Sequence, residues 1–210
     1  MSLVVFGLED AVTILQFLLD VTRMKAIPRS GWISHGVSLQ DVESVADHTF
    51  STCVLSSVLA DLEGKRGVRV NVEQVLRIAV LHDMSESLTF DISKAYLEYL
   101  GKRGEKMKDE IERSAWRHLV KRMRDPRLTR EYAHLYAEYA ANKTVEAKIV
   151  HAADALDILL QVIDYRRKGY PESMLADLWN STSAQLGKTK LPSVRKILRM
   201  IRREAKRVRN

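Results

Sequence analysis

Residues 144–167 form the most constraining stretch of this chain, because they are apolar on nearly every side. The residues that make them so are Val145, Ile149, Val150, Ala152, Ala153, Leu156, Ile158, Leu159, Val162 and Ile163. A helix that is hydrophobic all round is normally buried, so the segment predicts a central helix that other elements must cover. Gly169-Tyr170-Pro171 marks its end.

Composition favours helices in the rest of the chain as well. The 210 residues include only 9 glycines and 4 prolines, and long alternating runs of Val, Ile and Thr are absent. A chain of this length can bury one sizeable core. We therefore predict an all-α helical bundle with a single domain and about nine helical segments. The first is expected near residues 9–25, with Val12, Leu15, Leu18 and Leu19 facing inward.

Positive charge is concentrated at the C-terminal end. Ten of the 34 basic residues and one of the 27 acidic residues lie in residues 188–210, so the remainder is close to neutral despite a net charge of +7. Apolar residues recur there at helical spacing: Val194, Ile197, Leu198, Ile201, Ala205 and Val208. We predict a main domain over residues 1–187 and a basic amphipathic helix over 188–210 that docks on it. Binding of nucleic acid or an anionic surface is the alternative role, and is not favoured.

The cysteine content and hydropathy bear on the compartment. Cys53 is the single cysteine, which excludes an internal disulfide framework and suits a reducing cytosol. No basic segment followed by an apolar core resembles a signal peptide at the N-terminus, and no run of about 18 apolar residues predicts a membrane span. We expect a cytoplasmic protein that does not cross a membrane.

Two carboxylates, Asp154 and Asp157, lie inside the apolar segment. An isolated carboxylate in an apolar core costs several kcal/mol, so each requires a cation or a hydrogen-bond donor. His151, Asp154 and Asp157 are spaced three residues apart and share one helical face. Structural hydrogen bonding is the alternative reading for Asp154, and metal ligation is the one we favour.

Three further residues complete a possible metal site. His82 and Asp83 follow the apolar run 75–81, and His48 lies upstream. Two imidazoles and two carboxylates give a mixed nitrogen and oxygen site, and a single cysteine is too few for a structural zinc of the thiolate type. The set suits one divalent cation, with Mn, Co, Ni, Fe and Mg left open. Such a cation activates water and holds a phosphate oxygen, which points to hydrolysis of a phosphate ester.

Two more carboxylates follow the His-Asp pair. Glu86 would share a helical face with His82 and Asp83 if the helix that contains residues 75–81 continued. Asp91 comes after a short turn and could reach the same cavity. The alternatives are a solvated helix-end acid for Glu86 and an N-cap for Asp91. We favour catalytic proton transfer by both.

These motifs together resemble the 5′-deoxynucleotidase-like branch of the HD superfamily of metal-dependent phosphohydrolases. The resemblance runs from Gly7 to about Tyr170 and rests on Arg29-Ser30-Gly31-Trp32, Glu43-Ser44-Val45-Ala46-Asp47-His48, His82-Asp83-Met84-Ser85-Glu86, Asp91-Ile92 and Lys148 to Asp157. It implies an all-helical bundle, a homodimer, and removal of phosphate from deoxyribonucleoside 5′-monophosphates with a divalent metal.

The resemblance also implies residue roles. His48, His82, Asp83 and Asp154 fall on the metal-ligand positions, and Glu86 and Asp91 on the catalytic ones. Substrate contacts are expected at Arg29, which falls on a phosphate-binding position, at Trp32, near the sugar, and at Lys148 and Asp157. A snorkelling surface role is the alternative for Lys148. His151 is a candidate to contact a metal ligand without binding the metal itself. Surface or core packing is expected for His35, His118 and His134.

One departure from the family pattern leaves the sugar preference open. Ser30 and Gly31 separate Arg29 from Trp32, whereas bacterial members have the two residues adjacent. Another nucleotide, cyclic or a triphosphate, is the first alternative substrate. A metal-holding protein that binds nucleic acid or a partner through its basic tail is the alternative of a different class. The presence of both Glu86 and Asp91 favours the enzyme, because binding alone does not require them.

Overall fold

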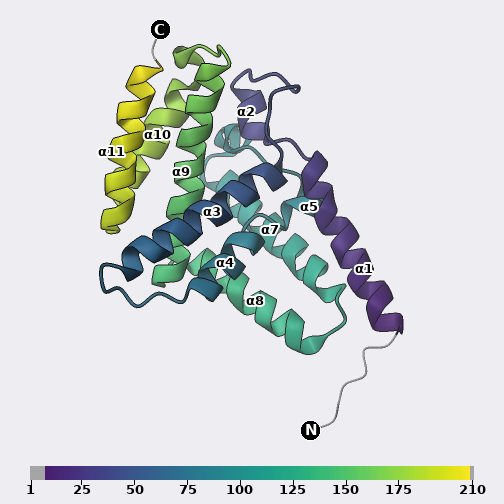
Figure 1. Cartoon of the computed structure of the whole chain (residues 1–210). Coiled ribbons are helices and arrows are strands. Elements are labelled where there is room, and N and C mark those ends of the chain that lie inside the picture. Colours follow the sequence, from purple (N-terminus) through teal and green to yellow (C-terminus); the bar gives the residue numbers. More distant parts are fainter. Residues whose placement is uncertain (1–7, 209–210) are drawn as a thin grey trace.

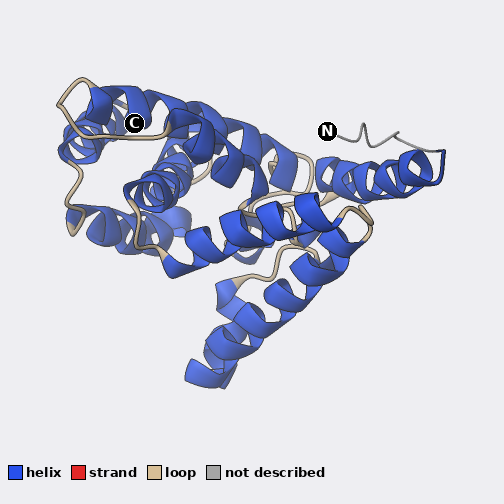
Figure 2. Cartoon of the chain, turned by 90° about the horizontal axis from the view of Figure 1, so that it is seen from below, coloured by secondary structure: helices blue, strands red, loops and turns tan. Residues whose placement is uncertain are grey.

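The computed structural model describes residues 8–208, and every named element in this range is a helix (Figures 1 and 2). A single antiparallel bridge joins Pro28 and Ser44 within the described residues. Its elements are α1 (Leu8–Thr22), η1 (Arg23–Ala26), α2 (Ser30–Ser34), α3 (Val45–Gly64), α4 (Val72–Leu81), α5 (Glu86–Thr89), α6 (Lys94–Leu97), η2 (Glu98–Leu100), α7 (Lys102–Lys121), α8 (Pro126–Ala141), α9 (Val145–Arg167), η3 (Glu172–Leu175), α10 (Ala176–Gly187) and α11 (Pro192–Arg207). The all-α prediction is confirmed. Residues 1–7 and 209–210, the outer ends of the predicted domain and tail, lie outside the described residues.

Helix α9 is the central element, as its apolar surface predicts. Thr144 caps its first turn by accepting a hydrogen bond from the amide of Ala147. The helix packs against α3, α4, α8, α10 and α11, and Figure 1 shows it running between α11 and the helices that carry the N-terminal half. Its buried members include Ile149, Leu156 and Leu159, which are fully enclosed. No described helix, α9 included, is long and apolar enough to span a membrane.

Capping residues define where the two helices beside α9 begin. Ser44 and Asp47 form a reciprocal capping box at the start of α3. Asn71 caps α4 by accepting from the amide of Gln74, as its spacing predicts. These starts place His48 in the second turn of α3 and His82 immediately after α4, and both helices pack on α9.

The basic tail forms α11, which packs against α10, α9 and α3. Its residues Val194, Leu198, Ile201 and Ala205 are buried in the main core. At its start, the amide and hydroxyl of Ser193 donate to the buried carboxylate of Glu63. We propose from these contacts that the tail and the preceding body form one folding unit.

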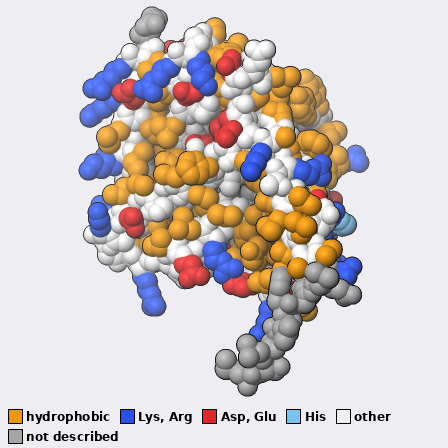
Figure 3. All heavy atoms as spheres, turned by 45° about the vertical axis from the view of Figure 1, so that its right-hand side comes forward, with side chains coloured by type: hydrophobic (Ala, Val, Ile, Leu, Met, Phe, Trp, Pro, Cys, Tyr) orange, Lys and Arg blue, Asp and Glu red, His pale blue; other side chains and the backbone are white. Residues whose placement is uncertain are grey.

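The predicted inward face of α1 is wrong. Val12, Leu15, Leu18 and Leu19 are 53–60% exposed, whereas Phe17 on the opposite side is buried. Asp20 lies on the buried side too, where it forms an ion pair with Arg122 at 2.9 Å. Both sides of this helix carry apolar residues, so periodicity alone could not tell which side faces the body. Figure 3 shows hydrophobic side chains gathered over the face that α1 contributes to.

Candidate metal centre

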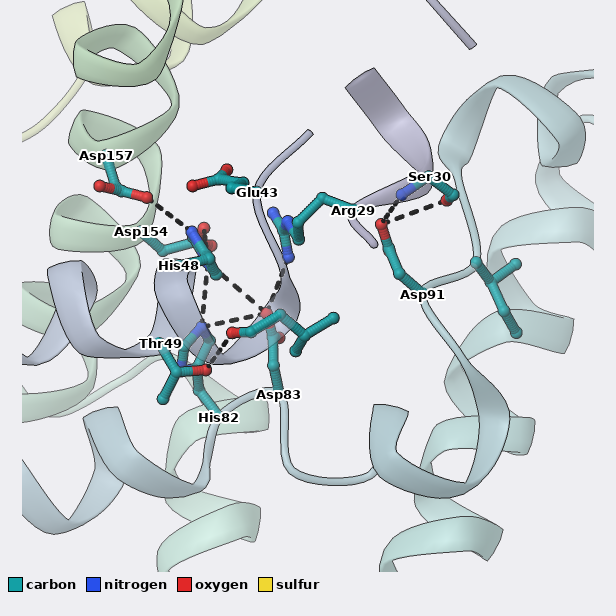
Figure 4. A network of polar contacts seen from close by, with 12 residues as sticks. Arg29, Ser30, Glu43, His48, Thr49, His82, Asp83, Asp91, Asp154 and Asp157 are labelled. Atoms are coloured by element: carbon teal, nitrogen blue, oxygen red, sulfur yellow. Dashed lines mark hydrogen bonds and ion pairs between the residues drawn. The ribbon is translucent and has the colours of Figure 1, made fainter. Parts of the chain in front are cut away.

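Four side chains from three separate parts of the chain meet beside α9 (Figure 4). The Nε2 atom of His48 lies 3.3 Å from Nε2 of His82, 3.3 Å from Oδ1 of Asp154 and 3.5 Å from Oδ2 of Asp83. Nε2 of His82 lies 3.2 Å from the same oxygen of Asp83. The structure therefore brings together the four residues predicted as metal ligands.

Each of the two imidazoles has a hydrogen-bond acceptor at Nδ1, the ring nitrogen that does not face the cluster. His48 Nδ1 lies 2.7 Å from Oδ2 of Asp157, and His82 Nδ1 lies 2.7 Å from the carbonyl oxygen of Ala79. An acceptor at Nδ1 favours the tautomer that carries its proton there, which leaves the Nε2 lone pair facing the cluster. The structure places Asp157 against Nδ1 of His48. The substrate contact expected of Asp157 stays a prediction.

This donor set fits a divalent cation. Two Nε2 lone pairs and two carboxylates that face one another at 3.2–3.5 Å repel unless a positive charge lies among them. Ligand bonds of about 2.0–2.2 Å to nitrogen and oxygen place neighbouring donors about 3 Å apart. The spacing observed here is close to that value, so all four residues could hold one cation.

The charges of the cluster are coupled. Burial raises the pKa of Asp83, but His82, Arg29 and His48 outweigh it and hold the pKa well below its usual range. Burial likewise raises the pKa of Asp154, and the hydrogen bond and charge of His48 lower it to about 2. Burial and Arg29 lower the pKa of His48, while Asp154 and Asp157 raise it to about 10. Both carboxylates are thus ionised at neutral pH, and His48 binds a proton where a cation would bind.

This proton predicts that metal affinity depends on pH. A metal ligand must be deprotonated, so a cation that binds His48 has to release its proton. Below about pH 10 the proton competes, and affinity should therefore fall as pH is lowered from about 8 toward 6. Calorimetric titration with Mn²⁺ in buffers of different ionisation enthalpy would count the released protons. Affinity that is flat over this range would contradict the prediction.

Glu86 lies near the cluster, but it is not on a continuation of α4. Helix α4 does not continue past Leu81, and a turn over 82–85 leads into α5, which begins at Glu86. The amide of Glu86 donates to the carbonyl of Asp83 at 2.9 Å, so the two side chains leave the same tight turn. Glu86 is only 3% exposed, and its Oε2 has no hydrogen-bond partner among the described residues. Burial, with Asp83 and Asp91 nearby, raises its pKa well above the usual value.

Asp91 lies on the far side of Arg29 from the histidines, against the start of α2 (Figure 4). Its Oδ2 accepts from the amide of Ser30 at 2.6 Å and from the Ser30 hydroxyl at 3.2 Å. The preceding residue, Phe90, has a φ of 61°. That conformation costs a non-glycine residue about 1–3 kcal/mol. It reverses the chain at the end of α5 and aims Asp91 toward Ser30. Asp91 thus caps α2 rather than the helix that follows it.

Arg29 connects these two groups of residues. Its Nη1 donates to Oδ2 of Asp83 at 2.9 Å, and its backbone amide donates to the carbonyl of Glu43. Burial lowers its pKa, but Asp83, Glu86, Asp91 and Asp154 outweigh this and raise it. A guanidinium has five N–H donors, of which the contact to Asp83 uses one. Arg29 is therefore a permanent cation beside the cluster.

Trp32 and Lys148 are not presented to the cluster in the way the sequence suggested. Trp32 is 3% exposed, packs edge-on against Tyr165, and donates its indole N–H to Glu43 at 2.7 Å. Lys148 is exposed, and its ammonium group donates to the carbonyl of Lys143 at 2.6 Å. The sugar and phosphate contacts proposed for these two residues stay predictions.

Three residues that sequence reasoning did not single out border the site. Glu43 approaches His48 and Asp157, with donor atoms within 4.8 Å of one another, and burial raises its pKa. Tyr139 packs edge-on against His82. Lys108 donates to the carbonyl of Ile92 at 3.0 Å. Glu43 belongs to the motif that ends at His48, so the sequence could have indicated it. Lys108 lies in α7 and Tyr139 in α8, and neither helix contains a motif that points to the site.

His151 supports the site indirectly. Its ring stacks on Tyr139 with centroids 4.1 Å apart, and its Nε2 lies 2.9 Å from the Tyr139 carbonyl oxygen. Tyr139 in turn contacts His82, so His151 lies one side chain away from a candidate ligand. Burial lowers the pKa of His151, which favours the neutral ring in this stack.

Comparison with known proteins gives the same family as the motifs. The HD domain family matches residues 21–195. The 5′-deoxynucleotidase HDDC2 of Xenopus laevis is 31% identical over 192 residues, which are 91% of this chain and 87% of the relative. The 5′-deoxynucleotidase HDDC2 of Homo sapiens is 29% identical over 180 residues, or 86% and 81% of the two chains. The 5′-deoxynucleotidase hdd1 of Schizosaccharomyces pombe is 32% identical over 161 residues, 75% of each.

Solved structures agree with this assignment. A conserved hypothetical protein from Pyrococcus furiosus superimposes with a TM-score of 0.75 at 31% identity, covering 90% of this chain and 99% of that one. An HD-domain phosphohydrolase from Listeria innocua gives a TM-score of 0.77 at 23% identity over 91% of this chain and 89% of that one, which supports the fold. The chain therefore belongs to the HD domain family, as a metal-dependent phosphohydrolase of the 5′-deoxynucleotidase-like type.

Proposed function

We propose that this protein hydrolyses nucleoside 5′-monophosphates, releasing the nucleoside and inorganic phosphate, with one divalent cation held by His48, His82, Asp83 and Asp154. The observation that carries the proposal is the convergence of these four side chains, each with a donor atom 3.2–3.5 Å from another's. The names of the relatives, all 5′-deoxynucleotidases, support the substrate class.

The chain's own residues divide the remaining work. A bound cation supplies a water of lowered pKa and an electrostatic hold on a phosphate oxygen. Arg29, a permanent cation beside Asp83, binds the phosphate group of the substrate. Glu86, whose buried carboxyl lies beside Asp83 with one unpartnered oxygen among the described residues and a raised pKa, takes part in proton transfer. Asp91, fixed by Ser30, orients the attacking water or protonates the leaving 5′-oxygen.

A nucleotide panel tests this function directly. Ribo- and deoxyribonucleoside 5′-monophosphates, 3′-monophosphates, cyclic nucleotides and triphosphates would be incubated separately with Mn²⁺, Co²⁺, Ni²⁺, Fe²⁺ and Mg²⁺. We expect phosphate release from the 5′-monophosphates to exceed release from all other classes with at least one cation. Preferred turnover of cyclic nucleotides or triphosphates would contradict the substrate class. The ratio of deoxyribose to ribose substrates decides the sugar preference.

We predict that Arg29→Ala mainly weakens substrate binding. Hydrogen bonds to charged groups contribute about 1.5–3 kcal/mol, so KM should rise roughly 10–100-fold while kcat changes much less. Arg23→Ala is the matched control, because Arg23 is exposed on the preceding turn and faces Phe90 instead. Metal content must be measured alongside, since Arg29 also pairs with Asp83. An unchanged KM would refute the phosphate role of Arg29.

We also propose that the chain forms a homodimer through the exposed apolar stripe of α1. Val12, Leu15, Leu18 and Leu19 form one side of this helix and are more than half exposed. Covering such a stripe with a second copy removes apolar surface from water. Leu15→Arg with Leu19→Arg should convert the dimer to a monomer in light scattering at micromolar concentration. Met200→Arg, at an exposed position on α11, is the control. A wild-type monomer would refute the proposal.

A further inference from the structure

A hollow lies away from the metal centre, where α9 ends against η3, α10 and α11. Its volume is about 390 Å³, and its polar lining residues include Arg166, Glu172, Ser183, Arg202 and Lys206, with Trp179 as its aromatic wall. Arg166 is nine residues beyond Asp157 on α9, which separates the two by about 13 Å along the helix axis. No residue of this hollow belongs to the candidate metal centre.

Two of the three nitrogens of the buried arginine that lines this hollow have no hydrogen-bond acceptor among the described residues. The Arg166 side chain is 6% exposed, and its guanidinium carbon lies 4.9 Å from the centre of the Trp179 ring. Nη2 is 3.5 Å from Oε1 of Glu172, which is an ion-pair distance but too long for a good hydrogen bond. Neither Nε nor Nη2 has a hydrogen-bond partner among the described residues. A buried charged donor left in this state is costly, so it points to an acceptor that binds there.

A second unsatisfied group lies in the same wall. The Ser183 hydroxyl is buried and has no partner within the described range, while the Ser183 carbonyl accepts from Nη2 of Arg202 at 3.3 Å. That contact holds Arg202 over the hollow. Lys206 lies one helical turn farther along α11 and lines the same space. Fixed donors from α9, α10 and α11 therefore face one cavity.

We propose that this hollow binds a small organic molecule through its phosphate group. Arg166, Arg202 and Lys206 bring three positive charges against the single negative charge of Glu172, so the lining favours an anion. Guanidinium groups match phosphate oxygens in planar, paired geometry, and the Ser183 hydroxyl adds a donor. The volume exceeds what a lone phosphate fills and lies within the roughly 300–1,000 Å³ of small-molecule sites. The organic part of the ligand would lie along Trp179.

Tryptophan fluorescence reports on this site. Trp32 and Trp116 are buried elsewhere, at 3% and 1% exposure, whereas Trp179 lines the hollow. Glucose 6-phosphate and inorganic phosphate serve as probes, with glucose as the uncharged control, in chelator to suppress binding at the metal centre. The test variant is Arg202→Ala with Lys206→Ala. The matched control is Arg199→Ala with Arg203→Ala, which removes the same charge from exposed positions of α11 outside the lining.

Glucose 6-phosphate should change the fluorescence saturably, and inorganic phosphate should bind more weakly. The pocket variant should lose at least about tenfold in affinity, because it loses two charge-assisted contacts, while the control changes by less than about threefold. Phosphate release from nucleotides should persist in the pocket variant, since neither residue lies at the metal centre. Absence of a saturable response to glucose 6-phosphate in the wild type overturns the proposal. Equal losses in both variants mean a diffuse basic surface, which overturns it as well.

Discussion

Asp83→Ala is expected to lose both its bound cation and its phosphohydrolase activity. Asp83 Oδ2 approaches both candidate histidine ligands and also accepts from Arg29, so its removal takes away a ligand and leaves Arg29 without this partner. Cation content should fall to background, and turnover should fall by more than about 10³-fold, because the catalytic water loses its activating charge. Atomic emission analysis of purified protein and phosphate release are the two measurements.

Three further variants serve as comparisons for this result. Asp157→Asn keeps every direct ligand but weakens the hydrogen bond behind His48, and partners of this kind are worth about 10–100-fold in metal affinity. Asp61→Ala removes an exposed carboxylate from α3 and should change neither quantity. Circular dichroism distinguishes a vacated site from an unfolded chain, and Asp83→Asn offers a variant of the same volume. Full cation occupancy in a folded Asp83→Ala protein would refute the ligand assignment.

Glu86→Gln should lower the activity of the protein and raise its stability. Turnover should drop roughly 100-fold or more, the usual effect of losing a general acid or base. Cation content and KM should change little, because the lost interaction belongs to the transition state. The free energy of unfolding should rise at neutral pH by about 0.5–2 kcal/mol, the range common for substitutions that relieve a strained functional site. The Glu86 carboxyl is buried with an unpartnered oxygen, so its ionised form is destabilising.

The pH dependence of that gain has a definite sign. The pKa of Glu86 in the folded protein is raised, so the unfolded chain ionises first as pH increases. Below about pH 4 both states hold the proton, and the variant should equal the wild type in stability. The wild type then loses stability relative to Glu86→Gln as pH rises through the unfolded value toward the raised folded one. Urea unfolding at several pH values measures this difference. An advantage for the variant only at low pH would contradict the burial argument.

The sequence predicted the elements whose signals are local. The all-round apolar character of residues 144–167 gave α9, and the cap at Asn71 gave the start of α4. The four candidate ligands were also predictable. A buried carboxylate such as Asp154 needs a cation or a hydrogen-bond donor, and the adjacent His82 and Asp83 are residues that can bind a cation. Their roles in metal binding and catalysis stay predictions.

The errors came from features that depend on tertiary contacts. Apolar residues on both sides of α1 hid which side faces the body, so the four leucine and valine residues were assigned inward. The turn over 82–85 ends a helix at a point without glycine or proline, so the sequence left open whether the helix continued to Glu86, and the structure shows that it does not. The contacts of Trp32 with Glu43 and Tyr165, and of Asp157 with His48, were not predicted, because they join segments distant in the sequence. Such pairings leave no local signature. The substrate roles expected of Trp32 and Asp157 stay predictions.

A cation titration of the stripped protein tests the central claim most directly. Protein freed of metal by a chelator would receive Mn²⁺ in increments while bound cation and phosphate release are recorded together. One site built from His48, His82, Asp83 and Asp154 predicts that activity rises linearly and saturates at one cation per chain. Activity that needs a second equivalent, or that persists in the stripped protein, would contradict the account.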